Sequence, residues 1–245
     1  MTTEFQASVP PPIRPALRGR LTRWLKRAGI LFATLLGGVL VAMVLLRFFD
    51  PPKTPVMLFD RLFGQSVDHR PVPLSRVSAN VIRAVITSED GRFCQHWGVD
   101  LDELKDAIED ARTGRPRGAS TITMQVVKNV FLWPQRSYVR KALELPLAYA
   151  LDLIVPKRRI LEIYLNIAEW GPGIYGVEAA AWNAFGKSAA RLDEAEAALL
   201  AVSLPNPAGR DAGDPSRSME RLARRLQQRM ATRPDLDCLG LKDSR

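Results

Sequence analysis

The residues with the clearest chemical potential crowd one short stretch of the chain, Ser88–Asp100. It carries two adjacent carboxylates, Glu89 and Asp90, followed by His96 and Asp100. Two acids at the C-terminal end of a predicted helix oppose the helix dipole. Such local conflicts are more frequent at functional sites than elsewhere, although a solvated helix end is the alternative interpretation. This stretch is therefore the first candidate for a site at which a carboxylate takes part in chemistry.

A second group combines two cations with a further acid. Glu144 lies four residues after Arg140 and three after Lys141, so the three side chains share one face of a predicted helix. A surface ion pair is the alternative interpretation of this group. Glu162 and Asn166 are also four residues apart, and we expect them either to bond each other in support of a cleft or to have a purely structural role.

Five segments, in order, resemble the signatures of the peptidoglycan glycosyltransferases, the lysozyme-like family 51 transferases. One such motif alone would be weak, but five in order over residues 77–207 are very specific. The S-x-x-K and K-T-G patterns of a transpeptidase are absent from the sequence, and segments 136–141 and 168–171 resemble the monofunctional subgroup. The five segments are Glu89–Asp100, Gly118–Gln125 continuing to Lys128 and Asn129, Arg140–Glu144, Lys157–Asn166, and Glu196–Ala201 with Pro205 and Pro207.

The resemblance implies a reaction. The substrate would be lipid II, a disaccharide-peptide on undecaprenyl diphosphate, whose sugar 4-hydroxyl attacks the lipid-linked end of the growing chain with inversion. A diphosphate leaves readily as an anion, so the site needs a base and positive charge rather than the general acid of a glycosidase. By motif position, Glu89 is the base, because a carboxylate in a partly desolvated cleft has a raised pKa. Glu144 is the second essential acid, which holds the cations or assists the donor sugar.

The same motifs supply the predicted substrate-binding residues. The cations of the second and third motifs are expected at the diphosphate, and Arg117 would join them from its loop. The helix start at Ser120 and Thr121 adds backbone donors suited to an anion. Asp90 would position Glu89, contact the substrate or be solvated. A divalent cation, Mg or Mn, would suit the diphosphate, but no ligand cluster specifies one and no other cofactor is expected. The predicted binding set is Asp90, Ser120, Thr121, Gln125, Lys128, Asn129, Arg140, Lys141, Glu162 and Asn166.

Other residues carry narrower expectations. Met124 stands where the family usually has the first of two glutamines, which predicts altered substrate contacts and not an inactive enzyme. His96 is expected to fix the loop after the acidic pair. Cys94 and Cys238 are far apart in the sequence and are expected to be free thiols, without a zinc-binding pattern. Residues 186–188 resemble the end of a P-loop but lack its first glycine and a preceding strand, which excludes nucleotide binding.

The elements that must hold these residues are almost all helices, because apolar residues recur at helical spacing and there is little strand signal. The fold class is therefore mainly α, and the resemblance implies a lysozyme-like, two-lobed glycosyltransferase domain preceded by one transmembrane helix. Pro146 should kink its helix. Helices are predicted over 78–89, 102–112, 122–132, 139–155, 156–170, 177–185, 192–203 and 217–230, with loops at 114–118 and 171–176.

An uncharged apolar run, Ala28–Leu46, precedes this domain and as a helix would span ~28 Å, close to the hydrocarbon thickness of a bilayer. Basic residues before the run predict a cytoplasmic N-terminus and a periplasmic catalytic domain, anchored in the inner membrane. A cleaved signal peptide or a buried core helix is the alternative. The expected divisions are a cytoplasmic basic tail (1–27), the transmembrane helix (28–47), a linker and membrane-proximal segment (48–70), the glycosyltransferase domain (71–210) and a basic C-terminal helix and tail (211–245).

The predicted function is the polymerisation of lipid II into β-1,4-linked glycan strands for cell wall biosynthesis. The expected partners are lipid II, the growing lipid-linked chain, the membrane, and cell-wall synthesis or division proteins. The formal net charge of +9 is partly explained by topology, so it does not indicate nucleic acid. Two rival functions stay open: a lysozyme-like hydrolase of the same polymer, and an inactive scaffold for the wall-synthesis machinery.

Overall fold

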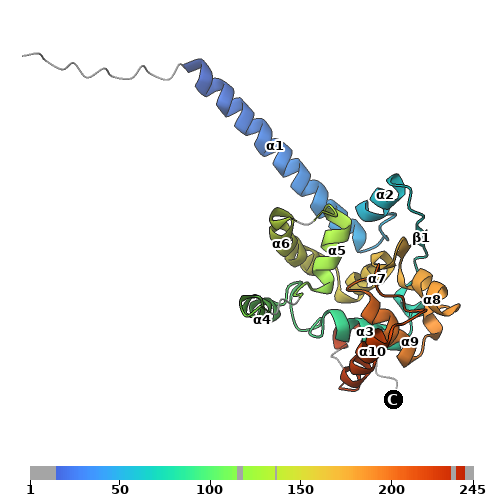
Figure 1. The fold of residues 1–245 in the computed structure, drawn as a ribbon. Helices are drawn as coiled ribbons and strands as arrows, with labels where there is room; N and C mark the ends of the chain where they lie inside the picture. The colour runs from blue at the N-terminus through green and yellow to red at the C-terminus, as the bar shows by residue number, and fades with distance from the viewer. Residues whose placement is uncertain (1–14, 115–117, 136, 233–235, 241–245) are drawn as a thin grey trace, which may run out of the picture. The chain divides into compact units, whose positions relative to one another are not determined.

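The computed structural model of the chain describes residues 15–114, 118–135, 137–232 and 236–240 (Figure 1). The predicted contribution of Arg117 to the site, and the resemblance at Arg136, fall outside these residues. The chain divides into two units, one ending at Ala42 and the other beginning at Met43. The second unit contains every residue of the candidate site.

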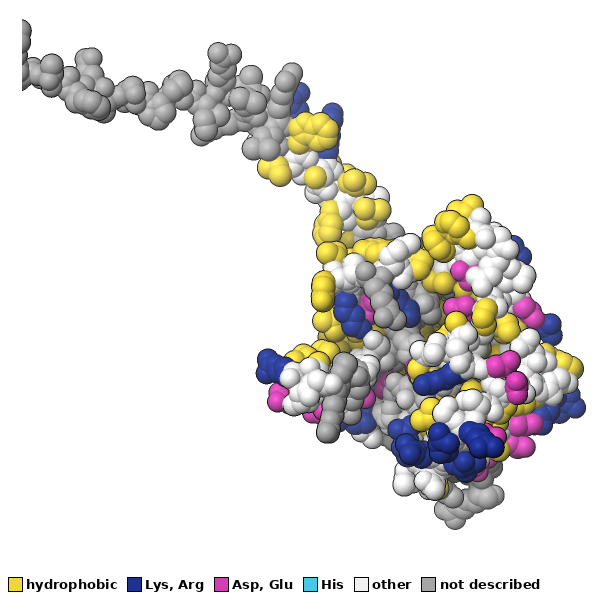
Figure 2. Space-filling model, in the orientation of Figure 1, with side chains coloured by type: hydrophobic (Ala, Val, Ile, Leu, Met, Phe, Trp, Pro, Cys, Tyr) yellow, Lys and Arg dark blue, Asp and Glu magenta, His cyan; other side chains and the backbone are white. Residues whose placement is uncertain are grey.

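The first unit consists mainly of one long helix, α1 (Pro15–Leu46). Its segment Thr22–Leu46 contains an 18-residue window with a mean hydropathy of 2.6 and is long and apolar enough to cross a membrane. Large apolar side chains such as Leu31 and Phe32 are more than half exposed, and Figure 2 shows yellow side chains along the helix. A helix that exposes apolar side chains on most of its surface is suited to lipid rather than to a protein core. The predicted membrane-spanning run is therefore helical, and its helix begins earlier in the chain than the expected boundary.

The second unit is mainly α, as predicted. Its secondary structure is stabilised at the helix starts by capping side chains: Thr121 accepts a bond from the backbone N–H of Met124, and Asp193 forms a capping box with Glu196. The helices are α2 (Pro55–Leu62), α3 (Ala79–Glu89), α4 (Leu101–Arg112), α5 (Ile122–Phe131), α6 (Tyr138–Ile154), α7 (Lys157–Ile167), α8 (Val177–Phe185), α9 (Glu194–Ser203) and α10 (Arg217–Met230).

Three short strands accompany the helices, although the sequence shows little strand signal. They are β1 (Asp68–His69), β2 (Glu169–Gly171) and β3 (Ile174–Tyr175), in the order β1-β3-β2, with β1 parallel and β2 antiparallel to β3. Strands of two or three residues are too short to show an alternating pattern, which explains why they were not predicted. As a result, α7 ends at Ile167 instead of reaching Trp170, and the expected linker 48–70 contains α2 and β1.

Two groups of helices form the core. α3 packs against α9 and α10, and α5 packs against α6 and α7. The buried face of α3 includes Val81, Ile82 and Val85, each almost without exposed surface. α6 continues through Pro146 to Ile154. α3, which ends at Glu89 in the first motif, and α5, which begins at Ile122 in the second, therefore both pack against a dense interior. This interior gives the site a rigid support.

A disulfide joins Cys94 to Cys238, so the expectation of free thiols is wrong. The two cysteines are 144 residues apart in the sequence but lie beside α7, where Arg158 Nη1 donates to the carbonyl of Leu239 over 2.9 Å. Only the folded chain reveals this proximity, because neither cysteine belongs to a recognisable disulfide spacing. The bond attaches the turn at 237–239 to the loop that follows the acidic pair.

Candidate active site

Glu89 is the last residue of α3, and its carboxylate is held from α5. Gln125 Nε2 donates to Glu89 Oε2 over 3.0 Å, and Ser88 Oγ lies 3.4 Å from Oε1. Burial raises the pKa of Glu89, while the bonds from Gln125 and Ser88 and the positive charge of Lys128 oppose that rise. A half-buried carboxylate with a raised pKa and a fixed orientation is suited to accept a proton.

Asp90 ties the end of α3 to the start of α5. It is only 2% exposed; Oδ1 lies 2.8 Å from His96 Nε2, and Oδ2 accepts the backbone N–H of Ile122 over 3.0 Å. Another donor in the first turn of α5, the N–H of Met124, is taken by Thr121 Oγ1. The α5 start was expected to offer such groups to the substrate, but the anion that it binds in this structure is Asp90. His96 has the loop-fixing role that the sequence predicts.

The loop after Asp90 packs closely on α6. Thr121 Oγ1 donates to the carbonyl of Gly98 over 2.6 Å. A Cβ at Gly98 would lie 2.4 Å from the carbonyl oxygen of Ala148, and the φ of Gly98 is +76°. Both the close approach and the positive φ require glycine at this position. The Thr121 hydroxyl is therefore used within the protein, where it joins the loop to the start of α5.

The cations of the third motif surround a buried acid. Lys141 Nζ lies 2.9 Å from Glu144 Oε2 and 2.7 Å from Ser120 Oγ, and Arg140 Nη1 lies 3.5 Å from Glu144 Oε1. Glu144 is 2% exposed and Arg140 8% exposed, so the alternative of a surface ion pair is wrong. Within this group, Nε and Nη1 of Arg140 are buried without a hydrogen-bond partner. Such donors are suited to a strong acceptor such as an oxyanion.

Four predicted binding residues line one cavity of about 340 Å³: Gln125, Lys128, Asn129 and Arg140. Glu89 reaches the same wall through its bond to Gln125. The cavity therefore gathers one cation of the second motif, Lys128, and one of the third, Arg140, while Glu89 and Lys141 do not line it. The other residues that line the cavity are Val56, Pro134, Tyr164, Ile167, Ala168, Glu169, Tyr175, Leu204, Pro205 and Pro207.

Two other predicted binding residues support the chain beneath this cavity. Asn166 binds the backbone of Val72 through both ends of its amide, at 3.0 and 2.9 Å. Glu162 accepts the N–H of Leu74 over 2.7 Å and pairs with Arg159. They bind the segment before α3 rather than each other. These bonds are consistent with the structural role that the sequence left open.

Met124 points into the core and is 1% exposed. It does not line the cavity with Gln125. The substitution at this position therefore affects core packing, and the altered substrate contacts that the sequence predicted have no basis in this geometry.

Among the cavity residues that sequence reasoning missed are Tyr164 and Glu169. Tyr164 is fully buried, and its hydroxyl lies 3.4 Å from Gln125 Oε1, on the amide end opposite Glu89. Burial raises the pKa of Tyr164, so its hydroxyl keeps its proton and donates to Gln125 Oε1. The Nε2 end of the Gln125 amide is therefore the end that faces Glu89. Burial also raises the pKa of Glu169. Both lie within or beside the quoted motifs, but only the fold turns them toward the cavity.

No metal centre is formed by the residues that the structure describes: no three His, Cys, Asp or Glu side chains gather in a suitable group. The divalent cation considered at a diphosphate stays a prediction.

Comparison with known proteins points in the same direction as this geometry. A family model described as Transglycosylase matches residues 57–232. The chain is 50% identical over 201 residues to a protein of Rhizobium meliloti (strain 1021) named biosynthetic peptidoglycan transglycosylase, covering 82% of this chain and 85% of that protein. Proteins of the same name from Brucella suis biovar 1 (strain 1330) and Mesorhizobium japonicum are 50% and 48% identical over 193 and 215 residues. The alignments cover 78% and 86% of this chain and 86% and 91% of those proteins.

Proposed function

This chain belongs to the transglycosylase family and is a peptidoglycan glycosyltransferase that polymerises glycan strands, and from that premise we propose that it joins lipid II units by inverting transfer with release of undecaprenyl diphosphate. The fold is mainly α and lysozyme-like. The proposed reaction takes place at the cavity lined by Gln125, Lys128 and Arg140.

Glu89 is the proposed general base. The acceptor 4-hydroxyl loses its proton to Glu89 as its oxygen bonds to C1 of the donor sugar and the bond from C1 to the diphosphate breaks. The raised pKa of Glu89 supports this role, since a base is most effective when its pKa approaches the working pH. Gln125 holds the carboxylate through its Nε2, and Tyr164 holds the other end of the Gln125 amide.

The leaving diphosphate is the proposed ligand of Arg140, Lys128 and Lys141. The observation that carries this assignment is Arg140, which is 8% exposed and lines the cavity; its Nη1 lies 3.5 Å from Glu144, but neither Nε nor Nη1 makes a hydrogen bond. A buried charged donor in that state has a high desolvation penalty, which a phosphate oxygen offsets. Glu144 holds Arg140 and Lys141 beside the cavity, and Ser120 supports Lys141.

The remaining predicted residues have positioning roles in this proposal. Asp90 holds the α3–α5 junction, Thr121 holds the loop on α6, and Glu162 and Asn166 hold the segment before α3. Asn129 lines the cavity and is proposed to contact the substrate directly. A divalent cation would neutralise the diphosphate together with these cations.

The proposed location is the inner membrane, with α1 as a single span, the N-terminus in the cytoplasm and the catalytic domain in the periplasm. The apolar segment Thr22–Leu46 and the basic residues around Arg23 support this topology. Exposed apolar side chains on α2 and α6, such as Leu62 and Leu153, would enter the lipid surface beside the precursor. The proposed domain boundaries follow residues 27, 47, 70 and 210. The proposed partners include cell-wall synthesis proteins.

Polymerisation of labelled lipid II by full-length protein tests the proposed function. We expect Glu89→Gln to stop polymerisation, and Arg140→Ala to lower kcat/KM by about 10²- to 10³-fold, the loss typical of one preorganised group at a developing charge. Arg140→Lys should recover part of that loss, and Arg221→Ala, which removes an exposed arginine from α10, should match the wild type.

Three results would contradict the proposal. Wild-type activity in Arg140→Ala would exclude Arg140 as a ligand of the diphosphate. Full cellular function of Glu89→Gln would favour an inactive scaffold. Shortening of preformed glycan strands without polymerisation would favour a hydrolase.

A further inference from the structure

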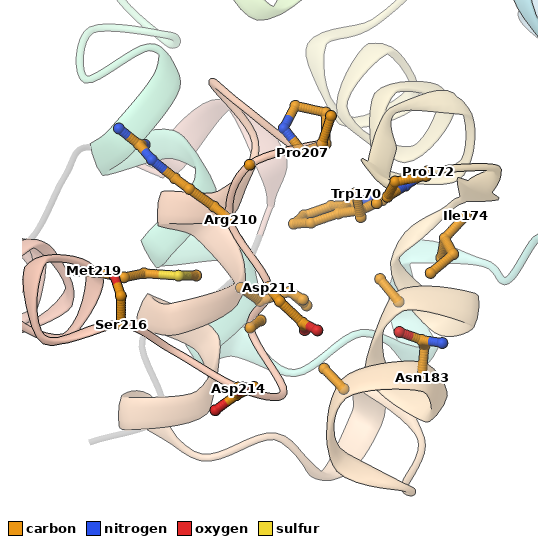
Figure 3. Close-up of a pocket in the computed structure, with 17 residues that line it drawn as sticks. Trp170, Pro172, Ile174, Asn183, Pro207, Arg210, Asp211, Asp214, Ser216 and Met219 are labelled. Carbon is orange, nitrogen blue, oxygen red and sulfur yellow. Dashed lines mark hydrogen bonds between the residues drawn. The ribbon is translucent and has the colours of Figure 1, made fainter.

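A second cavity, of about 420 Å³, lies outside the proposed catalytic site (Figure 3). It is formed by β2, α8, α9 and the segment 207–216 that leads into α10. Glu169 lines the catalytic cavity, and Trp170, the next residue of β2, lines this one. Because successive side chains of a strand point to opposite faces, the two cavities lie on different sides of β2. The second cavity is therefore a separate hollow, although Pro207 borders both.

A buried donor in the wall of this cavity has no acceptor. Trp170 is 4% exposed, and its indole Nε1 makes no hydrogen bond. Figure 3 shows the Trp170 ring along one side of the cavity. A buried indole N–H usually has a partner, because an unpaired one has a desolvation cost. We therefore expect a ligand of this cavity to bring an oxygen acceptor, such as a carbonyl.

Another wall of the cavity carries negative charge. Asp211 and Asp214 both line it and are exposed, and Asp211 Oδ1 accepts the N–H of Gly213 over 2.8 Å. Among the described residues that line the cavity, Arg210 is the only Lys or Arg. Figure 3 shows its guanidinium turned away from both acids, and its Nη1 donates to the carbonyl of Val202 over 2.7 Å. The cavity therefore attracts cations and repels anions such as a phosphate.

Much of the remaining surface of the cavity is apolar. Its apolar walls come from Ile174, Ala180, Leu200 and Met219. An aliphatic side chain can lie along such walls while its charged end reaches the acids, as the side chain of a lysine or arginine does. The volume falls in the range of small-molecule sites, about 300–1,000 Å³, and admits one such side chain with the backbone that carries it.

We propose that this second cavity docks a short basic segment of a partner protein, with one Lys or Arg side chain inside it. The cation binds Asp211 and Asp214, the aliphatic stem lies on the apolar walls, and a backbone carbonyl of the segment accepts the Trp170 N–H. A free cation would leave the Trp170 donor unpaired, and a neutral ligand would leave both acids without a charge partner. Charge and hydrogen bonding together therefore favour a basic peptide. The inference goes beyond the proposed function and does not depend on it.

The direct test is NMR titration of the full-length protein in detergent micelles with the blocked peptide acetyl-Ala-Lys-Ala-amide. The indole N–H signal of Trp170, identified by its loss in Trp170→Phe, should shift saturably, and binding should weaken as salt is added. The matched peptide acetyl-Ala-norleucine-Ala-amide keeps the aliphatic stem without the charge and should bind more weakly. We expect Asp211→Asn and Asp214→Asn to weaken binding of the lysine peptide about two- to fivefold each, the effect of one exposed ion pair. Glu194→Gln, at an exposed acid on α9, should bind as the wild type does.

A second readout is photo-cross-linking in living cells from p-benzoylphenylalanine in place of Asn183, an exposed residue that lines the cavity. We expect an adduct with a protein whose cross-linked peptide, identified by mass spectrometry, carries Lys or Arg beside the linked residue. Substitution of both Asp211 and Asp214 by asparagine should remove this adduct, whereas Glu194→Gln should retain it. Lipid II polymerisation by the purified double variant should match the wild type, because the cavity is separate from the catalytic one.

Four results would overturn the proposal. They are an unmoved Trp170 signal, equal binding of the lysine and norleucine peptides, an adduct that survives the loss of both acids, and cross-links to stem peptides of the wall polymer in place of a protein. Failure of the proposed function gives a different result, since wild type would then not consume lipid II, or Glu89→Gln would consume it normally.

Discussion

Gln125 offers a sharp test of the proposed base, because it bonds to Glu89 without belonging to the reacting atoms. Its Nε2 donates to Glu89 Oε2 over 3.0 Å, a bond that favours the ionised carboxylate and lowers the pKa of Glu89 against the effect of burial. Gln125→Met fills a similar volume but removes the donor. A hydrogen bond to a charged group contributes about 1.5–3 kcal/mol, and one pKa unit corresponds to about 1.4 kcal/mol. The pKa of Glu89 should therefore rise by about 1–2 units.

The sign of the effect follows from the role of a base. Glu89 must be ionised to accept a proton, so kcat/KM for lipid II should fall on the acidic side of the profile. In Gln125→Met this fall should begin at a pH about 1–2 units higher than in the wild type, with partial recovery of activity at alkaline pH. The assay is the initial rate of lipid II polymerisation from acid to alkaline pH. Gln228→Met, at an exposed amide of α10, is the matched control. An unmoved acidic limb, or a shift to lower pH, would refute the assignment of Glu89 as the base held by Gln125.

The other predictions concern stability and are measured by thermal or denaturant unfolding. The pKa of Glu89 is raised in the folded state above its unfolded value. The ionised side chain therefore destabilises the fold at pH values above both pKa values, and not below them. Glu89→Gln should raise Tm at neutral pH but not in acid, and an equal gain at all pH values would contradict this. Asn166→Leu should lower the free energy of unfolding by about 1–3 kcal/mol, because it leaves the backbone groups of Val72 unpaired; an unchanged denaturation midpoint would contradict it. Cys94→Ser should destabilise by about 2–5 kcal/mol, and a reductant should lower the Tm of wild type but not of a variant in which Cys94 and Cys238 are both serine.

Much of the helical fold could be predicted, because most helices combine a long apolar period with clear end signals. α8 and α10 have the predicted bounds, and Gly186 ends α8 in the left-handed conformation. The strands could not be predicted, since pairs such as Asp68–His69 with Ile174–Tyr175 exist only through their partner. The disulfide likewise depends on two distant segments that only the fold brings together.

The candidate site was also only partly predictable from the sequence. Motif order was enough to expect Lys128 and Arg140 near each other, and both line one cavity, which Glu89 reaches only through its bond to Gln125. Motif order was not enough to show which polar side chains form hydrogen bonds within the protein instead of facing a ligand. Asp90 and Asn166 have the residue types of a binding site, but their hydrogen bonds are to the protein, a fact that depends on atomic positions. The roles of all these residues remain predictions until variants are measured.

The forked carboxylate of Asp90 has a consequence for inhibitors. One oxygen binds the loop through His96 and the other binds the first turn of α5, so the helix that ends in Glu89 and the helix that carries Gln125 form one rigid unit. Lys141, on α6, is also held by the protein, because it bonds to Ser120 just before α5 and to Glu144. A compound that contacts the α3–α5 junction would therefore meet a carboxylate that two hydrogen bonds already fix. Resistance substitutions at this junction should be rare, because a change there would also disturb Glu89.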